Sequence, residues 1–134
     1  MEHFGILQPL IQSFFAVQDN VKYYHWQTTS YARHKATCTF LATFSTLSDQ
    51  FVETFLGHFP ECKVFLARSK SLTFNVDPAI ENFNNLKSDS VALMLEKLCI
   101  ELKSLDVKLP SDLLNIRDEI VGLCKQTLYL FSFK

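Results

Sequence analysis

Apolar side chains recur at three- and four-residue steps along almost the whole chain, and this helical period limits the fold more than any other feature. The period extends over residues 6–28, 31–55, 91–105 and 113–128. Only 3 glycines and 4 prolines occur in 134 residues, which argues against a β-sandwich, because its many short strands need frequent turn residues. The pattern therefore predicts an all-α protein with four long helices.

Residues that favour helix ends lie where the period breaks, and they are Thr29 or Ser30, Gly57 with Pro60, Ser88 or Asp89, and Pro110. The connection between the second and third helices, residues 58–87, is much longer than the other two. Within it, Asp77-Pro78 predicts the start of a short helix that Asn82 ends, because proline favours the first helical position. We therefore expect one domain over residues 1–134, a ferritin-like four-helix bundle whose long crossover carries the short helix.

Composition limits the partners of the chain. With 13 basic and 14 acidic residues the net charge is −1, so no global positive field draws the protein to nucleic acid. Charged residues interrupt every apolar run, and the N-terminus does not resemble a signal peptide, so we expect no membrane partner and a cytoplasmic location. The four cysteines form no C-x-x-C pair and are expected to be reduced thiols, with Cys38 in the core, whereas Phe131 and Phe133 are expected at the surface.

Four polar side chains form a candidate metal-binding set: His25, His34, Asp49 and Glu53. Asp49 and Glu53 are four residues apart, so both carboxylates lie on one helix face, where they repel each other unless a cation lies between them. His25 is near the end of the first expected helix and His34 is near the start of the second, so the short link can bring their imidazoles together. Two imidazoles and two carboxylates suit iron, zinc or manganese.

One chain alone cannot complete this set. His34 and Asp49 are fifteen residues apart, which is roughly 22 Å along a helix axis. Two copies of the second helix packed antiparallel about a two-fold axis would bring the histidine end of one chain to the carboxylate end of the other. We therefore expect a homo-oligomer, at least a dimer, with two equivalent sites.

The order His25-Trp26, then His34, then Asp49-x-x-x-Glu53 resembles the ferroxidase signature of the Dps mini-ferritins, in the ferritin-like superfamily. The wider segment 24–36, YHWQTTSYARHKA, is similar to Dps-like proteins of large DNA viruses. The resemblance implies an iron-binding protein with its site at a dimer interface, where the same four residues are metal ligands and catalytic residues. It further implies a dodecameric shell, Fe(II) oxidation by peroxide or oxygen that protects against oxidative stress, and a place in the host cytoplasm or virion.

Two departures from the Dps pattern support an alternative. The two histidines are nine residues apart, closer than in the bacterial proteins, and Cys38 stands where an acidic ligand normally follows the second histidine. We also expect no DNA binding through a lysine-rich tail, since residues 1–4 contain no lysine. The alternative is a structural or virion-associated helical-bundle assembly protein with a degenerate metal site and no catalysis. The sequence leaves ferroxidase activity open, and a helical adaptor without a ligand is a third interpretation.

Overall fold

The computed structural model describes residues 2–68, 76, 79–105 and 108–133, and every regular element within them is helical. The elements in chain order are α1 (Glu2–Gln27), α2 (Tyr31–His58), α3 (Glu61–Arg68), the short 3-10 helix η1 (Leu86–Ser88), α4 (Ser90–Lys103) and α5 (Ser111–Phe131). The predicted all-α class is confirmed. None of these helices contains an apolar stretch of the length needed to cross a membrane.

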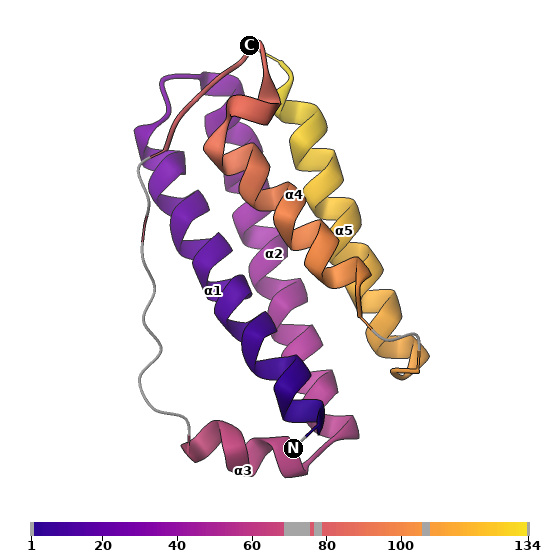
Figure 1. The fold of residues 1–134 in the computed structure, drawn as a ribbon. Coiled ribbons are helices and arrows are strands. Elements are labelled where there is room, and N and C mark those ends of the chain that lie inside the picture. Colours follow the sequence, from indigo (N-terminus) through magenta and orange to yellow (C-terminus); the bar gives the residue numbers. More distant parts are fainter. Residues whose placement is uncertain (1, 69–75, 77–78, 106–107, 134) are drawn as a thin grey trace.

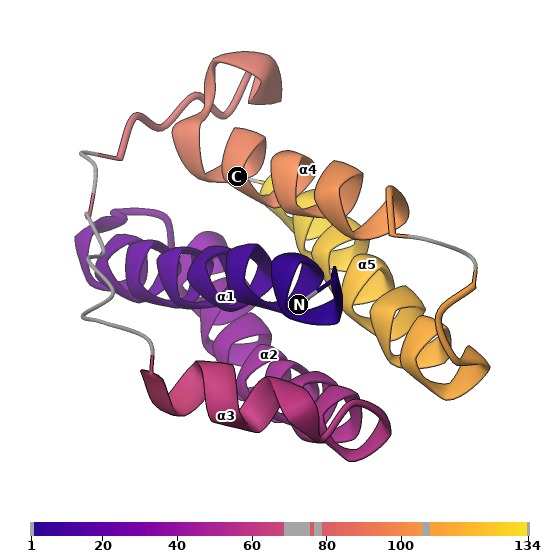
Figure 2. The ribbon, with the colours of Figure 1, turned by 60° about the horizontal axis from the view of Figure 1, so that its bottom comes forward.

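The helices α1, α2, α4 and α5 lie side by side, and α3 lies across the end of the molecule where α2 finishes (Figure 1). Contacts join the long helices in the cyclic order α1, α2, α5, α4, and α3 packs against α1 and α2 (Figure 2). α1 and α5 run in one direction, whereas α2 and α4 run in the opposite one (Figure 1). The chain between α3 and α4 therefore connects opposite ends of the molecule.

The apolar stripes predicted from the helical period meet in one core. The side chains of Phe40, Phe44, Phe51 and Phe55 on α2 have no exposed surface. Phe14 of α1 packs edge-on against both Phe44 and Phe51, with ring centroids 5.8 Å apart in each pair. Because burying one such ring contributes about 1.5–3 kcal/mol, these rings account for much of the stability of the α1–α2 pair.

Two predicted helix caps are confirmed. Ser30 caps α2 by accepting a hydrogen bond from the backbone N–H of Arg33 at 3.2 Å. Asp89 caps α4 by accepting from the backbone N–H of Ala92 at 3.0 Å. Each bond satisfies one of the N–H groups that lack a partner in the first turn of a helix.

The short helix of the long connection is not at the predicted position. Pro78, its expected first residue, lies outside the described residues, and residues 79–82 are not helical. Side chains bind the backbone N–H groups of this segment instead: Asp89 accepts from Asn82 at 3.1 Å, and the Asn82 side chain accepts from Asn85 at 3.0 Å. A regular helix forms earlier in the connection, as α3.

Two predictions about exposure are wrong. Cys38 is exposed, because it lies on the side of α2 opposite the phenylalanine stripe. Phe131 is fully buried, because the end of α5 packs its ring against Tyr24, with centroids 6.0 Å apart. Phe133 is 48% exposed, as expected. The other three thiols are buried, and they belong to Cys62, Cys99 and Cys124.

Candidate metal centre

His25 and His34 lie against each other where α1 ends and α2 begins. Their rings are stacked, with centroids 4.0 Å apart and planes inclined by 16°. Residues 28–30 form the short link between the two helices, and this link brings the imidazoles together as the sequence predicts. His34 is exposed, and His25 is partly buried.

Each imidazole forms a hydrogen bond through its Nδ1 atom. The Nδ1 of His34 lies 3.0 Å from the backbone carbonyl of His25, and since a carbonyl only accepts, this Nδ1 is the donor. The Nδ1 of His25 lies 2.9 Å from the Oγ1 of Thr37, which itself donates to the carbonyl of Arg33 at 2.8 Å. With the Thr37 proton on that carbonyl, the Thr37 oxygen accepts from the Nδ1 of His25. A neutral imidazole with its proton on Nδ1 has its electron pair on Nε2, and neither Nε2 forms a hydrogen bond with the described residues.

Asp49 and Glu53 lie on the exposed side of α2, one turn apart. The helix is continuous from His34 to Asp49, so about 22 Å of helix axis separates the two residues. Within the described part of a single chain, no group of three or more His, Cys, Asp or Glu side chains could hold a metal ion. One chain thus brings the two histidines together and leaves both carboxylates away from them.

One exposed stripe of α2 contains three of the four predicted ligands, since only His25 lies on another helix. We call it the outer stripe, and it consists of His34, Cys38, Ala42, Ser45, Asp49 and Glu53. These residues follow one another at three- or four-residue steps, so they share one helix face. Lys35 lies next to the histidine end, both acids lie at the other end, and residues 36–48 carry no charge. The two ends of the stripe therefore differ in chemistry, with an imidazole at one end and two carboxylates at the other.

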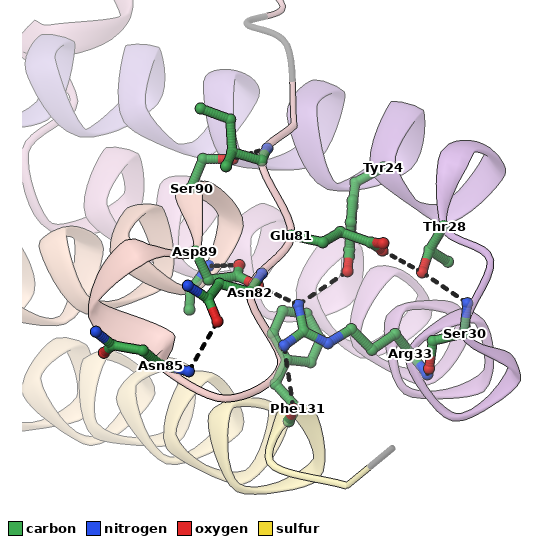
Figure 3. Close-up of polar contacts among 12 residues, drawn as sticks. Tyr24, Thr28, Ser30, Arg33, Glu81, Asn82, Asn85, Asp89, Ser90 and Phe131 are labelled. Carbon is green, nitrogen blue, oxygen red and sulfur yellow. Dashed lines mark hydrogen bonds and ion pairs between the residues drawn. The ribbon is translucent and has the colours of Figure 1, made fainter.

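A buried charged cluster lies near the start of α2, on the side of the helix that faces the core. It was not predicted from the sequence. Arg33 has no exposed surface, and its guanidinium donates to the carboxylate of Asp89, to the hydroxyl of Tyr24 at 2.9 Å and to the backbone carbonyl of Phe131 at 3.1 Å (Figure 3). We call these four residues the Arg33 cluster. It joins α1, α2, the start of α4 and the end of α5.

Contacts within and around the Arg33 cluster offset the desolvation of its charges. The Arg33 guanidinium lies over the rings of Phe83 and Phe131, 4.6 and 4.5 Å from their centroids. Burial lowers the pKa of Arg33, but hydrogen bonds with Asp89 and Tyr24 outweigh this effect, so the pKa lies above its usual value. Arg33 therefore stays charged in the interior.

The sequence does contain a signal for Arg33. Stepping back from Phe44 and Phe40 at three- or four-residue intervals reaches Thr37 and then Arg33, so both polar residues lie on the stripe that faces the core. A charge on such a stripe needs a buried partner. Asp89, predicted only as a helix cap, is that partner.

Comparison with known proteins places the chain in a family. Residues 25–131 match a family described as "Family of unknown function (DUF5856)", and this range contains all four candidate ligands. The chain is also 27% identical over 110 residues to a protein of Enterobacteria phage T4 named "Uncharacterized 14.6 kDa protein in mobD-ri intergenic region". That similarity covers 82% of this chain and 75% of the phage protein. No solved structure matches the chain. Because the family match extends over most of its length, the chain belongs to the DUF5856 family.

Proposed function

We propose that this protein is a Dps-like iron-binding protein that acts as a homo-oligomer with metal sites shared across a two-fold dimer interface. In each site the ligands are His25 and His34 of one chain and Asp49 and Glu53 of its partner. A pair of chains then holds two equivalent sites.

The outer stripe of α2 is the observation that carries this proposal. His34 and Asp49 lie eight and seven residues from Ala42, on opposite sides of it. When two stripes pair antiparallel about an axis near Ala42, His34 of each chain therefore lies opposite Asp49 of the other. The small side chains of Cys38, Ala42 and Ser45 at the centre permit the two helices to approach closely.

The donor atoms suit the proposed metal. In each imidazole Nδ1 donates a hydrogen bond, and Nε2 has the electron pair that can bind a metal. Metal-binding histidines in proteins are commonly oriented by such a hydrogen bond. Two such nitrogens with two carboxylate groups suit iron, zinc or manganese, and the Dps resemblance favours iron among them. Cys38 adds no third donor within the chain, since it forms no metal-holding group with the histidines.

The arrangement of the helices supports a ferritin-like four-helix bundle. The order of directions α1 up, α2 down, α4 down and α5 up, with one long connection between α2 and α4, is the order in that class of bundle (Figure 1). By the Dps resemblance, the dimers assemble further into a dodecameric shell.

The proposed substrate is Fe(II). Two Fe(II) ions each give one electron to one molecule of peroxide, which takes up two protons and leaves as two waters; oxygen is the alternative oxidant. His25, His34, Asp49 and Glu53 bind and orient the ions, while the redox chemistry belongs to the iron.

A mixing experiment tests whether the site is shared between chains. The variant His25→Ala/His34→Ala lacks the nitrogen donors, and Asp49→Ala/Glu53→Ala lacks the oxygen donors, so each homodimer has no complete site. A heterodimer of the two variants, isolated through different affinity tags, has one complete site. We expect it to bind Co(II) and to oxidise Fe(II) with half the number of sites of the wild type, while both homodimers are inactive.

Matched controls separate the shared site from a general loss of charge. His3→Ala/His58→Ala removes the other two histidines, and Asp118→Ala/Glu119→Ala removes two exposed acids of α5, so both should bind metal as the wild type does. A heterodimer as inactive as its parents would contradict the shared site. Metal binding by either parent variant alone would contradict the ligand assignment.

A second candidate function is a structural assembly protein that forms the same α2 interface without catalysis. It is favoured by the exposed aromatic rings around the histidines, since Trp26 is 64% and Tyr31 is 74% exposed, and by the presence of Cys38 on the outer stripe where a carboxylate would strengthen a metal site. Exposed aromatic rings are frequent in protein interfaces. Assembly without metal binding or Fe(II) oxidation would select this function over the first.

A further inference from the structure

Thr37 links the candidate metal ligands to the interior of the protein. It lies on the core side of α2, one turn after Arg33, and its side chain has no exposed surface. Its hydroxyl is nevertheless bonded to a histidine of another helix, because the Nδ1 of His25 on α1 reaches its Oγ1 at 2.9 Å. No other threonine on the core side of the described helices has a histidine as its partner.

The direction of this hydrogen bond follows from the other bonds of the hydroxyl. The single proton of Thr37 is directed to backbone carbonyls of its own helix, at 2.8 Å to Arg33 and 3.1 Å to His34. With the proton of Thr37 on either of these carbonyls, its oxygen is free to accept the Nδ1–H of His25. This arrangement of the hydroxyl favours the tautomer of His25 in which Nδ1 carries the proton.

The second imidazole is held by the end of α1. The carbonyl of His25 is among the last four of that helix, which have no helical N–H to accept. The Nδ1–H of His34 donates to it at 3.0 Å. The stacked rings are thus oriented by two different groups, one from each helix.

We propose that Thr37 is a positioning residue of the metal site, which holds His25 in the tautomer with the electron pair on Nε2 and so presets it to bind a cation. The part of this inference that concerns metal rests on the proposed function, whereas the part that concerns the tautomer does not. Thr37 contacts no metal in this scheme and acts only through His25.

Groups that orient a metal-binding histidine in this way change its affinity for metal by about 10- to 100-fold when they are removed. Thr37→Val replaces the hydroxyl by a methyl group and removes the acceptor, while it keeps the branched shape of the side chain. Thr37→Ser keeps the acceptor. The wild type and Thr37→Val therefore differ in the one γ-position that the inference concerns, and Thr37→Ser shows whether the oxygen alone is sufficient.

The experiment measures the tautomer and the metal affinity separately. Nitrogen-15 NMR of the metal-free protein at alkaline pH reports the proton position in His25, and competition titration with Co(II) reports the affinity. We expect the wild type and Thr37→Ser to show the tautomer with Nδ1 protonated. We expect Thr37→Val to show a mixture of tautomers and Co(II) binding that is about 10- to 100-fold weaker.

A matched control is available in α5. Thr127 is 2% exposed, and its hydroxyl donates to the carbonyl of Leu123 at 2.9 Å, so it has the same local bond as Thr37 without a histidine. Thr127→Val should lower the stability of the fold to a similar extent and leave both the tautomer and the affinity unchanged.

Each outcome decides between the two proposals. A wild-type protein in which the electron pair of His25 is on Nδ1 overturns the inference without any variant, even if Thr37→Val does not fold. If the wild type binds Co(II), equal affinity in Thr37→Val also overturns the inference. If the wild type binds no metal, but Thr37→Val changes the tautomer of His25, the result supports the role of Thr37 in orienting His25. The same result rejects the proposed function.

Discussion

The guanidinium of Arg33 and the carboxylate of Asp89 form an ion pair in which neither side chain has any exposed surface. The two residues are 56 positions apart in the sequence, and their contact fixes the start of α4 against the start of α2. Tyr24 and Phe131 bind the same guanidinium. Arg33 of α2 therefore connects the ends of α1, α4 and α5 at this end of the molecule.

Breaking this ion pair should destabilise the fold strongly. Arg33→Met leaves Asp89 buried without a counter-charge, so we expect the free energy of unfolding to fall by about 3–5 kcal/mol. Urea denaturation followed by circular dichroism measures this value. Asp89→Asn keeps the cap of α4, and the double variant should lose less than the sum of the two single losses.

An exposed ion pair provides the control for that prediction. Lys125 lies 3.1 Å from Glu96 with both side chains nearly half exposed. Lys125→Met should change the free energy of unfolding by no more than about 1 kcal/mol. If Arg33→Met were as mild as Lys125→Met, the Arg33 cluster would not hold the helices together.

The phenol of Tyr24 should titrate late. Its burial, and then its hydrogen bond with Glu81, raise the pKa of Tyr24 from 10.0 to about 12, although Thr28 and Arg33 act in the opposite direction. Because the folded pKa lies above the unfolded one, the stabilisation is fully present below pH 10 and is lost as the pH rises through about 12. Ultraviolet titration of tyrosinate should show a late component that Tyr24→Phe removes, and its presence in that variant would refute the assignment.

The outer stripe of α2 should mediate dimerisation. Ala42→Arg places a long charged side chain at the centre of the proposed interface, so we expect light scattering after size exclusion to give the mass of a monomer. Gln126→Arg introduces the same side chain on the exposed side of α5 and should leave the mass of the wild type. An oligomer of unchanged mass in Ala42→Arg would exclude pairing through this stripe.

The thiols should differ sharply in reactivity. Cys38 is exposed, so in the monomeric Ala42→Arg variant it should react quickly with iodoacetamide, and in the assembled wild type it should react more slowly. Cys62, Cys99 and Cys124 are buried and should react only after denaturation, which mass spectrometry of the labelled peptides can follow. Rapid labelling of any of these three in the native protein would show that the core opens readily.

The sequence predicted the helices well because their signals are local. The cap at Ser30 and the apolar stripe that includes Phe44 and Phe51 depend only on neighbours within a turn or two, and both are present in the structure. The position of the short helix could not be predicted in the same way. The backbone N–H of Asn82 donates to the side chain of Asp89, seven residues later, and this contact takes the donor that a helix would need.

In the candidate site, too, local features could be predicted from the sequence and non-local ones could not. The approach of His25 and His34 follows from the short link between two helices, which the sequence contains. The proton positions on these rings do not follow from the sequence, because they depend on Thr37 and on a carbonyl at the end of α1. That these histidines bind a metal together with Asp49 and Glu53 of a second chain remains a prediction.

By itself, the sequence determined that this chain is helical, where its long helices lie and which face of each is apolar, since a period of 3.6 residues is a property of neighbouring positions. Only the tertiary structure decided that Asp89, Tyr24 and Phe131 surround the buried Arg33 and that Phe131 closes the core. The physical reason is that the burial of a charge is favourable only when partners from distant segments surround it, and such partners meet only in the folded chain.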